Sequence, residues 1–241
     1  MSYLIFFYAL FGYIASLAAL TFLIFWVYGW EFMKYSVDKP FIVLDGNPFI
    51  IDLVLLLLFG FQHSLMARES FKKRFMKRFS PAMVAATYAT ASSFCLVLIF
   101  LFWQPVDGTL WAFHEGVGYW VLTGLYVLGW VFAFIATFII DHFALFGLRQ
   151  GYRELRNIPE PKPVFQVKLF YKYVRHPIQA GTLLGLFSAP VMSYSHLLFA
   201  LGMGIYILIG LWFEERSLTA LFGESYEAYR RTTPMLIPFL H

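Results

Sequence analysis

Long apolar runs, separated by short polar segments, dominate the chain. A helix needs about 20 apolar residues to cross the hydrocarbon core of a bilayer. Four runs with few or no charged residues reach this length: Leu4 to Tyr28, Pro48 to Ala67, a stretch within Phe79 to Val106, and Val117 to Ile140. The pattern therefore predicts four membrane-spanning helices before the polar middle of the chain.

Two further apolar pieces, Pro177 to Met192 and Leu197 to Phe213, flank a short polar sequence. As a helix the first piece is about 24 Å long, which is marginal against a hydrocarbon core of about 30 Å. We therefore expect a helical hairpin that crosses fully or incompletely, for a total of five or six spans. Three prolines between Leu155 and Val164 forbid a continuous helix there. The stretch from Asp141 to Arg175 is accordingly expected to form a surface segment.

Composition supports this interpretation and excludes several soluble classes. The 241 residues are 60% hydrophobic, 21% aromatic and only 13% charged, whereas a soluble domain carries about 25% charged residues. The single cysteine excludes a disulfide-stapled module, and the net charge of +4 is too small for a surface that follows nucleic-acid phosphates. The predicted fold class is all-α: a polytopic transmembrane helix bundle in one domain, residues 1–241, with the lipid bilayer as its partner and no nucleic acid.

Basic residues predict the orientation of this bundle. Sixteen of the 18 lysine and arginine residues fall in alternate loops, at residues 68–78, 149–175 and 216–231. The loop at residues 31–46 holds the other two, and the loop at residues 104–116 has none. Because cytoplasmic loops carry the excess of Lys and Arg, we expect the three basic loops and the amino terminus in the cytoplasm.

Ionisable residues near or within spans mark functional sites by default. Four polar groups fall at the predicted cytoplasmic ends: Gln62-His63-Ser64, Asp141-His142, Arg175-His176-Pro177 and Glu214-Glu215-Arg216. Taken singly, each has a structural explanation, such as an interhelical hydrogen bond or a hydrated helix end. Their convergence from four distant segments favours one polar site at the cytoplasmic membrane interface.

The last two groups suit the chemistry of S-adenosylmethionine. Pro177 at a helix start leaves first-turn amides free for an anion, and Arg175 can hold a carboxylate through two hydrogen bonds. Glu214 or Glu215 can bind an ammonium group or ribose hydroxyls. An aromatic slot for the adenine and the sulfonium has four candidates: Phe213, Phe222, Tyr226 and Tyr229.

The block at residues 171–238 joins a Tyr-Val-Arg-His-Pro sequence, Tyr173 to Pro177, to Glu214-Glu215 and then to a series of tyrosines and prolines. In order and spacing it resembles the carboxyl half of the isoprenylcysteine carboxyl methyltransferase superfamily. In that superfamily the block forms the S-adenosylmethionine site. The resemblance implies these cofactor-binding residues: Tyr173, Arg175, His176, Pro177, Gln179, Gly181, Glu214, Glu215, Tyr226, Tyr229 and Arg230.

Two motifs in the remaining chain, Phe61 to Arg68 and Asp141 to Gln150, resemble the NnrU-like branch of that superfamily. Within the branch they are most similar to the bacterial methanethiol S-methyltransferases. The resemblance implies methylation of a small volatile thiol: methanethiol to dimethyl sulfide, or hydrogen sulfide to methanethiol. It also implies a bacterial inner membrane protein whose active site faces the cytoplasm.

A thiol is a poor nucleophile until it loses its proton, so a base would help the reaction. The candidate bases are His142, oriented by Asp141, and His63, oriented by Gln62. The candidate thiol-binding residues are Gln62, Ser64 and Phe143. We expect no metal site.

Two other functions stay open at this point. The NnrU-like branch also contains relatives that resemble a haem-dependent isomerase, in which the histidines of both motifs would be haem ligands. A small-molecule transporter is a second alternative. It has less support, because the charged groups cluster at one face and no polar path crosses the middle of the predicted spans.

Overall fold

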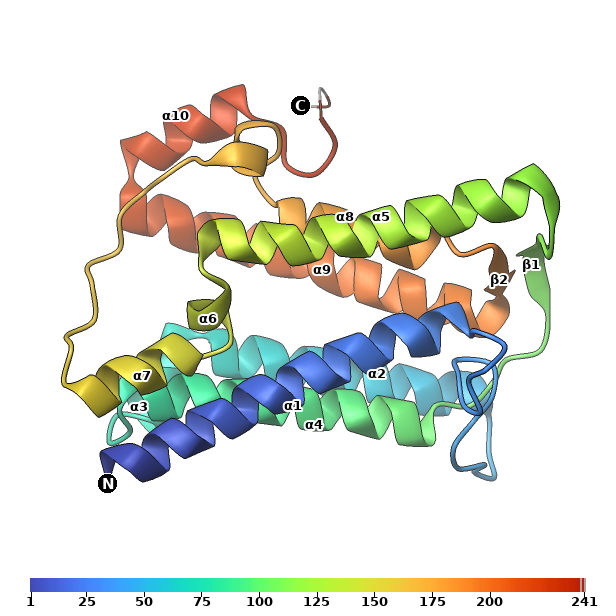
Figure 1. The fold of residues 1–241 in the computed structure, drawn as a ribbon, viewed down its shortest axis with the longest axis horizontal. Helices are drawn as coiled ribbons and strands as arrows, with labels where there is room; N and C mark the ends of the chain where they lie inside the picture. Colours follow the sequence, from blue (N-terminus) through green and yellow to red (C-terminus); the bar gives the residue numbers. More distant parts are fainter. Residues whose placement is uncertain (239, 241) are drawn as a thin grey trace. The chain divides into compact units, whose positions relative to one another are not determined.

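The computed structural model describes residues 1–238 and 240. By its contacts the chain divides into two compact units. Figure 1 shows the helices and strands, coloured from the amino to the carboxyl terminus. Unit 1 comprises Met1–Gly108, His142–Pro161 and Ser193–His196, and unit 2 comprises Thr109–Asp141, Lys162–Met192 and Leu197–His241.

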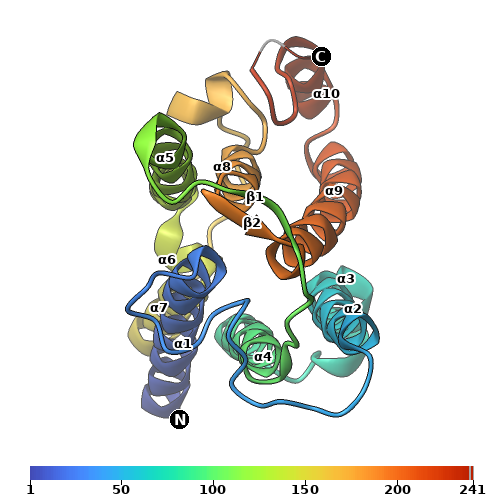
Figure 2. The same cartoon turned by 90° about the vertical axis from the view of Figure 1, so that its right-hand side faces the viewer.

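Three long apolar helices form the body of unit 1: α1 (Ser2–Tyr28), α2 (Pro48–Ala67) and α4 (Pro81–Phe102). Helix α4 packs against both α1 and α2, as the end-on view in Figure 2 shows. Gly12 permits the first contact, because a Cβ there would lie 3.0 Å from the Thr90 hydroxyl oxygen. Small and hydroxyl-bearing residues let helix backbones approach closely in membranes. Unit 1 is therefore built as a membrane bundle.

Local signals in the sequence set the ends of these helices. Pro48 and Pro81 each occupy a first helical position, where proline's fixed φ favours the helix. The Asn47 and Ser80 side chains accept hydrogen bonds from the first-turn amides. Gly29 ends α1 in the left-handed conformation, with φ of 70°. Three short helices complete unit 1: α3 (Glu69–Phe75), α6 (His142–Leu145) and α7 (Leu148–Arg156).

Unit 2 is organised around the contact between α5 (Gly116–Ile140) and α8 (Pro177–Phe187). The backbones of the two helices touch: a Cβ on Gly129 would lie 2.5 Å from the Gly185 nitrogen. Helix α9 (Tyr194–Phe222) packs on the other side of α8, where Gly204 faces Leu183 and Phe187 across ordinary van der Waals distances. A 3-10 turn, Leu169–Lys172, precedes α8 in the chain, and helix α10 (Glu224–Thr232) follows α9.

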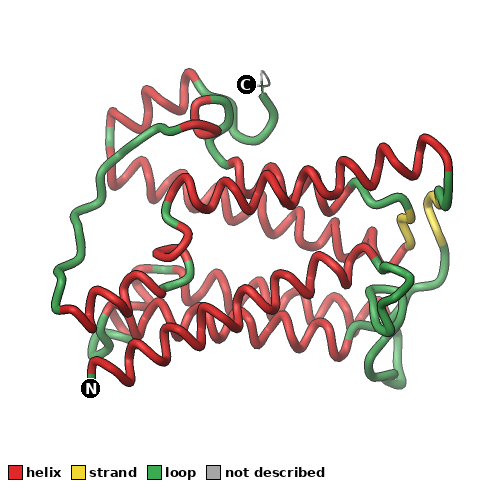
Figure 3. Tube along the Cα trace, in the orientation of Figure 1, coloured by secondary structure: helices red, strands yellow, loops and turns green. Residues whose placement is uncertain are grey.

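These elements confirm the predicted all-α polytopic fold. Within the described residues, five helices are long and apolar enough to cross a membrane: α1, α2, α4, α5 and α9. The segment at residues 157–168 contains no helix or strand, in agreement with its prolines. Figure 3 shows it as a long stretch of loop.

The first arm of the hairpin differs from the prediction, because its helix ends at Phe187 and not near Met192. Pro190 explains the difference, since the residue before a proline is disfavoured in the helical conformation. The chain then runs extended and forms strand β2 (Val191–Ser193), which pairs with β1 (Thr109–Ala112). The Pro190 carbonyl accepts a hydrogen bond from the Phe113 amide at 3.0 Å. The extended backbone is therefore bonded to protein, as non-helical backbone at membrane depth requires.

The second arm is longer than predicted. Helix α9 begins at Tyr194 and continues past Phe213 to Phe222. Glu214 and Glu215 therefore lie inside the helix and do not end it. A carboxylate at the carboxyl-terminal end of a helix interacts unfavourably with the helix dipole. At an interior position this cost is absent.

Candidate functional site

Glu215 is the centre of a buried polar cluster in unit 2. Its Oε1 accepts a hydrogen bond from Arg175 Nε at 2.6 Å and lies 3.1 Å from His176 Nε2. Its Oε2 lies 3.3 Å from Arg230 Nε, and the Tyr226 hydroxyl donates to Oε1 at 3.4 Å. One carboxylate thus joins α9 to the residues that precede α8 and to α10.

Arg175 is also bound to the end of α10 by backbone groups. Its Nη1 donates to the Arg230 carbonyl at 3.1 Å and to the Thr233 carbonyl. The backbone amides of Arg175 and His176 donate to the Pro234 and Met235 carbonyls, at 2.9 and 3.1 Å. The carboxyl-terminal segment is therefore held against the start of α8 by side-chain and main-chain hydrogen bonds together.

Glu214 and Glu215 are neighbours in sequence but differ in exposure. The Glu215 side chain is 9% exposed, whereas that of Glu214 is 48% exposed. Glu214 Oε2 lies 3.9 Å from His176 Nδ1, too far for a hydrogen bond. The Arg230 side chain, 55% exposed, and the exposed Tyr173 are also accessible. The cluster thus has a buried half that is fully bonded and an accessible half that carries charge.

An aromatic wall lies beside this cluster. The Phe165 ring contacts the rings of Phe222, Tyr226 and Tyr229, with centroids 5.4 to 5.9 Å apart. Burial raises the pKa of Tyr229 to about 12, an effect that the Arg175 guanidinium partly offsets. Burial and the Glu215 carboxylate raise the pKa of Tyr226 as well. Both hydroxyls therefore stay protonated at neutral pH and can donate hydrogen bonds.

Helix α8 contributes its amino end and two of the predicted residues. Pro177 occupies its first turn, and no side chain caps it. The half-buried Gln179 lies in that turn. Gly181 packs against α5, where a Cβ would lie 2.7 Å from the Ala133 nitrogen. Gly181 is therefore explained by helix packing, whether or not it also approaches a ligand.

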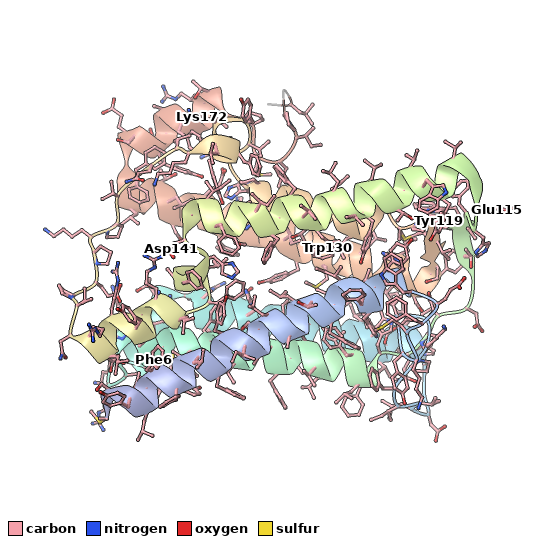
Figure 4. All side chains as sticks on the ribbon, viewed as in Figure 1. Phe6, Glu115, Tyr119, Trp130, Asp141 and Lys172 are labelled. Atoms are coloured by element: carbon pink, nitrogen blue, oxygen red, sulfur yellow. The ribbon has the colours of Figure 1, made fainter. Side chains whose placement is uncertain are left out.

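His142 lies in unit 1, at the start of α6, and is almost fully buried. Its Nε2 lies 3.1 Å from the Tyr13 hydroxyl. The rings of Tyr13, Phe143 and Phe146 surround it, with centroids 5.1 to 5.7 Å from the imidazole. Asp141, labelled in Figure 4, ends helix α5 in an extended conformation. The tyrosine hydroxyl is thus a partner of His142 that the motif alone does not indicate.

His63 lies on α2 and bonds two residues of α4. Its Nε2 bonds the Tyr88 hydroxyl, and its Nδ1 lies 3.0 Å from the Ser92 hydroxyl. Gln62 was expected to orient this ring, but its amide donates to the Met66 sulfur at 3.2 Å. The expectation failed because Gln62 and His63 project from different sides of the same helix, about 100° apart. Hydroxyl groups of α4 orient His63 instead.

Two of the predicted thiol-binding residues lie in the same turn of α2. The Gln62 Oε1 is buried and has no hydrogen-bond partner among the described residues. Ser64 is half-buried. A buried acceptor without a partner costs free energy, so Gln62 offers an unused group for a ligand.

Sequence reasoning missed several members of these clusters, among them Tyr13, Tyr88, Ser92, Phe165 and Thr233. Tyr13 and Tyr88 lie within apolar runs, where an aromatic residue is normally interpreted as a contact with lipid. Phe165 follows three prolines in a segment interpreted as surface. A usable signal existed for Tyr88 and Ser92, because residues 87 to 93 are rich in hydroxyl groups for a membrane span.

Comparison with known proteins gives strong matches across most of the chain. It is 44% identical over 195 residues to methanethiol S-methyltransferase 2 of Bradyrhizobium diazoefficiens, which covers 81% of this chain and 75% of that protein. It is 41% identical over 209 residues to the methanethiol S-methyltransferase of Crocosphaera subtropica, covering 87% and 82%. A more distant relative is Nurim of Bos taurus, 31% identical over 183 residues, covering 72% and 69%. No family model matches the chain, and no solved structure matches it significantly.

Proposed function

We propose that this chain, which belongs to the methanethiol S-methyltransferase family, uses S-adenosylmethionine as methyl donor and binds it in unit 2. Membership of the family makes it a multi-pass membrane methyltransferase that acts on a small thiol. The thiol we propose is methanethiol, which yields dimethyl sulfide. The polar cluster around Glu215, with its accessible Glu214, is the observation that carries the proposal for the donor.

The residues of unit 2 fit the chemical groups of S-adenosylmethionine. The half-exposed Glu214 carboxylate suits the ammonium group, and the uncapped start of α8 suits the carboxylate. The Arg175 Nη2 group has no protein partner among the described residues and can add to carboxylate binding. The wall of Phe165, Tyr226 and Tyr229 suits the adenine. When bound, S-adenosylmethionine supplies an electrophilic methyl group on a sulfonium.

Glu214 and Glu215 have different parts in this proposal. Glu215 bonds Arg175, His176, Arg230 and Tyr226, so it has little capacity for a ligand. We assign it the role of a positioning residue that fixes the buried half of the cluster. Glu214 lies 3.9 Å from His176 Nδ1 and near the hydroxyls of Tyr171 and Tyr226, and its side chain is half-exposed. Glu214 is thus the acidic residue that contacts the donor.

His142 is the base that we propose for the thiol. A protonated Tyr13 hydroxyl, bonded to Nε2 as donor, would leave Nδ1 to carry the ring proton. To accept a thiol proton at Nε2, the imidazole must exchange this bond for one to the substrate, and Tyr13 then supplies a polar neighbour for the resulting cation. The surrounding rings exclude water and suit a substrate with a single methyl group. His142 would hold the thiol proton while the thiolate accepts the methyl group that bound S-adenosylmethionine would supply.

His63 is the second candidate in the same unit. Both of its ring nitrogens bond hydroxyl groups, so it can pass a proton between Tyr88 and Ser92. Its bonds are complete without a ligand, which supports a structural part for it. The unpartnered Gln62 Oε1 on the next residue can accept the weak S–H donor of a thiol.

The proposed setting is a bacterial inner membrane, with the amino terminus and the site facing the cytoplasm. The distribution of basic residues over alternate loops supports this orientation. A fusion reporter at the carboxyl terminus and one in the loop at residues 104–116 should report opposite sides of the membrane.

Calorimetry on the purified protein tests the donor site. We expect S-adenosylmethionine to bind, and Glu214→Gln to weaken its affinity by about 10- to 100-fold, since a hydrogen bond to a charged group is lost. Glu224→Gln, an exposed acid on α10, is the matched control and should bind normally. Unchanged affinity in Glu214→Gln would remove this residue from the site. A Soret band in the visible spectrum, with no binding of the donor, would favour the haem-dependent alternative.

A further inference from the structure

A groove of about 520 Å³ lies in unit 1 between α1, α6 and α7. Its walls are mostly apolar, and two arginines line it as well; the lining residues are Phe6, Leu10, Phe143, Leu148, Arg149, Tyr152, Arg153 and Ile158. Figure 4 labels Phe6 on the part of α1 that α7 covers. The groove therefore offers an apolar surface and a basic one to the same ligand.

Helix α7 carries these two surfaces as separate stripes. Arg149, Arg153 and Arg156 recur at intervals of four and three residues, which places them on one side of the helix. Gly151 lies on another side and packs on α1, because a Cβ there would lie 2.6 Å from the Ala9 Cβ. This pattern of a basic stripe beside an apolar one is typical of helices that lie in a membrane interface.

The end of α7 closes one side of the groove. Asn157 adopts the left-handed conformation, with φ of 55°, and turns the chain back. The Ile158 amide then donates to the Arg153 carbonyl at 2.8 Å, which holds the Ile158 side chain over the last turn. The groove wall is thus a fixed feature of the helix end.

The depth of the groove follows from α1, which is a membrane-spanning helix that starts at Ser2. Phe6 and Leu10 lie in its first three turns, so the groove opens where headgroups meet acyl chains. By the distribution of basic residues this is the cytoplasmic leaflet, whose anionic lipids attract Lys and Arg.

We infer that this groove binds one anionic phospholipid, with an acyl chain against Phe6, Leu10 and Ile158 and the phosphate at Arg149 and Arg153. The apolar walls disfavour a soluble anion, which would leave them uncovered. The two arginines disfavour a neutral apolar ligand as the sole occupant. An anionic phospholipid satisfies both surfaces at once.

Glu160 is an acidic group that faces Arg153. Arg153 Nη1 lies 3.2 Å from Glu160 Oε2, and both side chains are partly exposed. Such a pair contributes little to stability, so a lipid phosphate can compete for Arg153.

Native mass spectrometry of the full chain tests this inference, with phosphatidylglycerol and phosphatidylcholine as probes. We expect phosphatidylglycerol to be retained preferentially. Each arginine near an anionic lipid adds about fivefold in affinity, so Arg149→Ala/Arg153→Ala should weaken binding by roughly 30-fold. Leu10→Trp, which fills the apolar wall, should weaken the binding of both lipids.

Arg74→Ala/Arg78→Ala is the matched control, because it removes the same charge from exposed positions outside the groove. An equal loss in this variant, or equal retention of the two lipids, would overturn the inference. Displacement of the lipid by inorganic phosphate would show a site for free anions, and displacement by methanethiol would assign the groove to the substrate. A melting temperature equal to that of the parent protein is required of every variant compared.

Discussion

Glu215 in unit 2 and His142 in unit 1 are both almost fully buried, yet different chemistry surrounds them. Glu215 pairs with two arginines and a histidine, whereas His142 bonds a tyrosine hydroxyl within a group of aromatic rings. A buried charge needs charged partners, and an imidazole that exchanges a proton needs a neighbour that leaves it neutral. This difference supports the proposal that the charged donor binds in unit 2 and the apolar thiol in unit 1.

The largest effect should be on turnover, and it should come from a change to His142 in unit 1. His142→Ala should lower turnover at neutral pH by about 10²- to 10⁴-fold and leave the affinity for S-adenosylmethionine intact, because a general base is lost. The deficit should shrink as pH rises, since free thiolate becomes abundant above the thiol's own pKa. Turnover measured from pH 6 to 10 by headspace detection of dimethyl sulfide checks this. A deficit that stays constant over the range would make His142 a structural residue.

The next largest effect should be a loss of stability, and it should come from a change to Glu215 in unit 2. Glu215→Ala leaves Arg175, His176 and Tyr226 buried without their shared acceptor, so it should destabilise the protein by about 3 to 5 kcal/mol. Glu214→Ala should cost less than about 1 kcal/mol, because that side chain is half-exposed. Thermal unfolding in detergent compares the two neighbours. Equal losses of stability in the two variants would contradict the assignment of Glu215 as the positioning residue and Glu214 as the binding residue.

Arg175→Ala should affect both properties by an intermediate amount. We expect the affinity for S-adenosylmethionine to fall by about 1.5 to 3 kcal/mol, since a charged hydrogen bond is lost. Arg175→Lys keeps the charge but not the planar geometry, so it should recover only part of the affinity. Calorimetry on both variants measures this. Full recovery by lysine would show that charge alone matters at this position.

The smallest effect should distinguish the two histidines of unit 1. Tyr13→Phe should lower turnover by about 5- to 10-fold, because the protonated His142 loses a polar neighbour worth about 1 kcal/mol. Tyr88→Phe is the matched control, since it removes the corresponding bond to His63. We expect this control to lower the melting temperature more than the turnover. The reverse result would identify His63 as the base.

The apolar runs predicted most of the fold, since α1, α2, α4 and α5 each coincide with a run that has few or no charged residues and is closed by a proline, a glycine or a charged residue. They failed at α8, where composition stays apolar after the helix ends and only Pro190 marks the change. The polar motifs named Arg175 and Glu215, which form an ion pair in unit 2, and the role of these residues in binding the donor stays a prediction. Tyr13, the partner of His142, was beyond such reasoning, because a tyrosine in an apolar run does not reveal which helix it faces.

The half-helical, half-extended segment from Pro177 to Met192 has a consequence for biogenesis. Its helix spans about 16 Å, and the extended residues after it add about 3.3 Å each, so together they approach the thickness of a bilayer core. A translocon that recognises spans as helices of about 20 residues would not insert this segment into the bilayer as a span by itself. Its strand needs β1, which lies in the loop before α5 and is synthesised earlier. Insertion should therefore be ordered in time, with the loop at residues 104–116 already across the membrane when the ribosome delivers the hairpin.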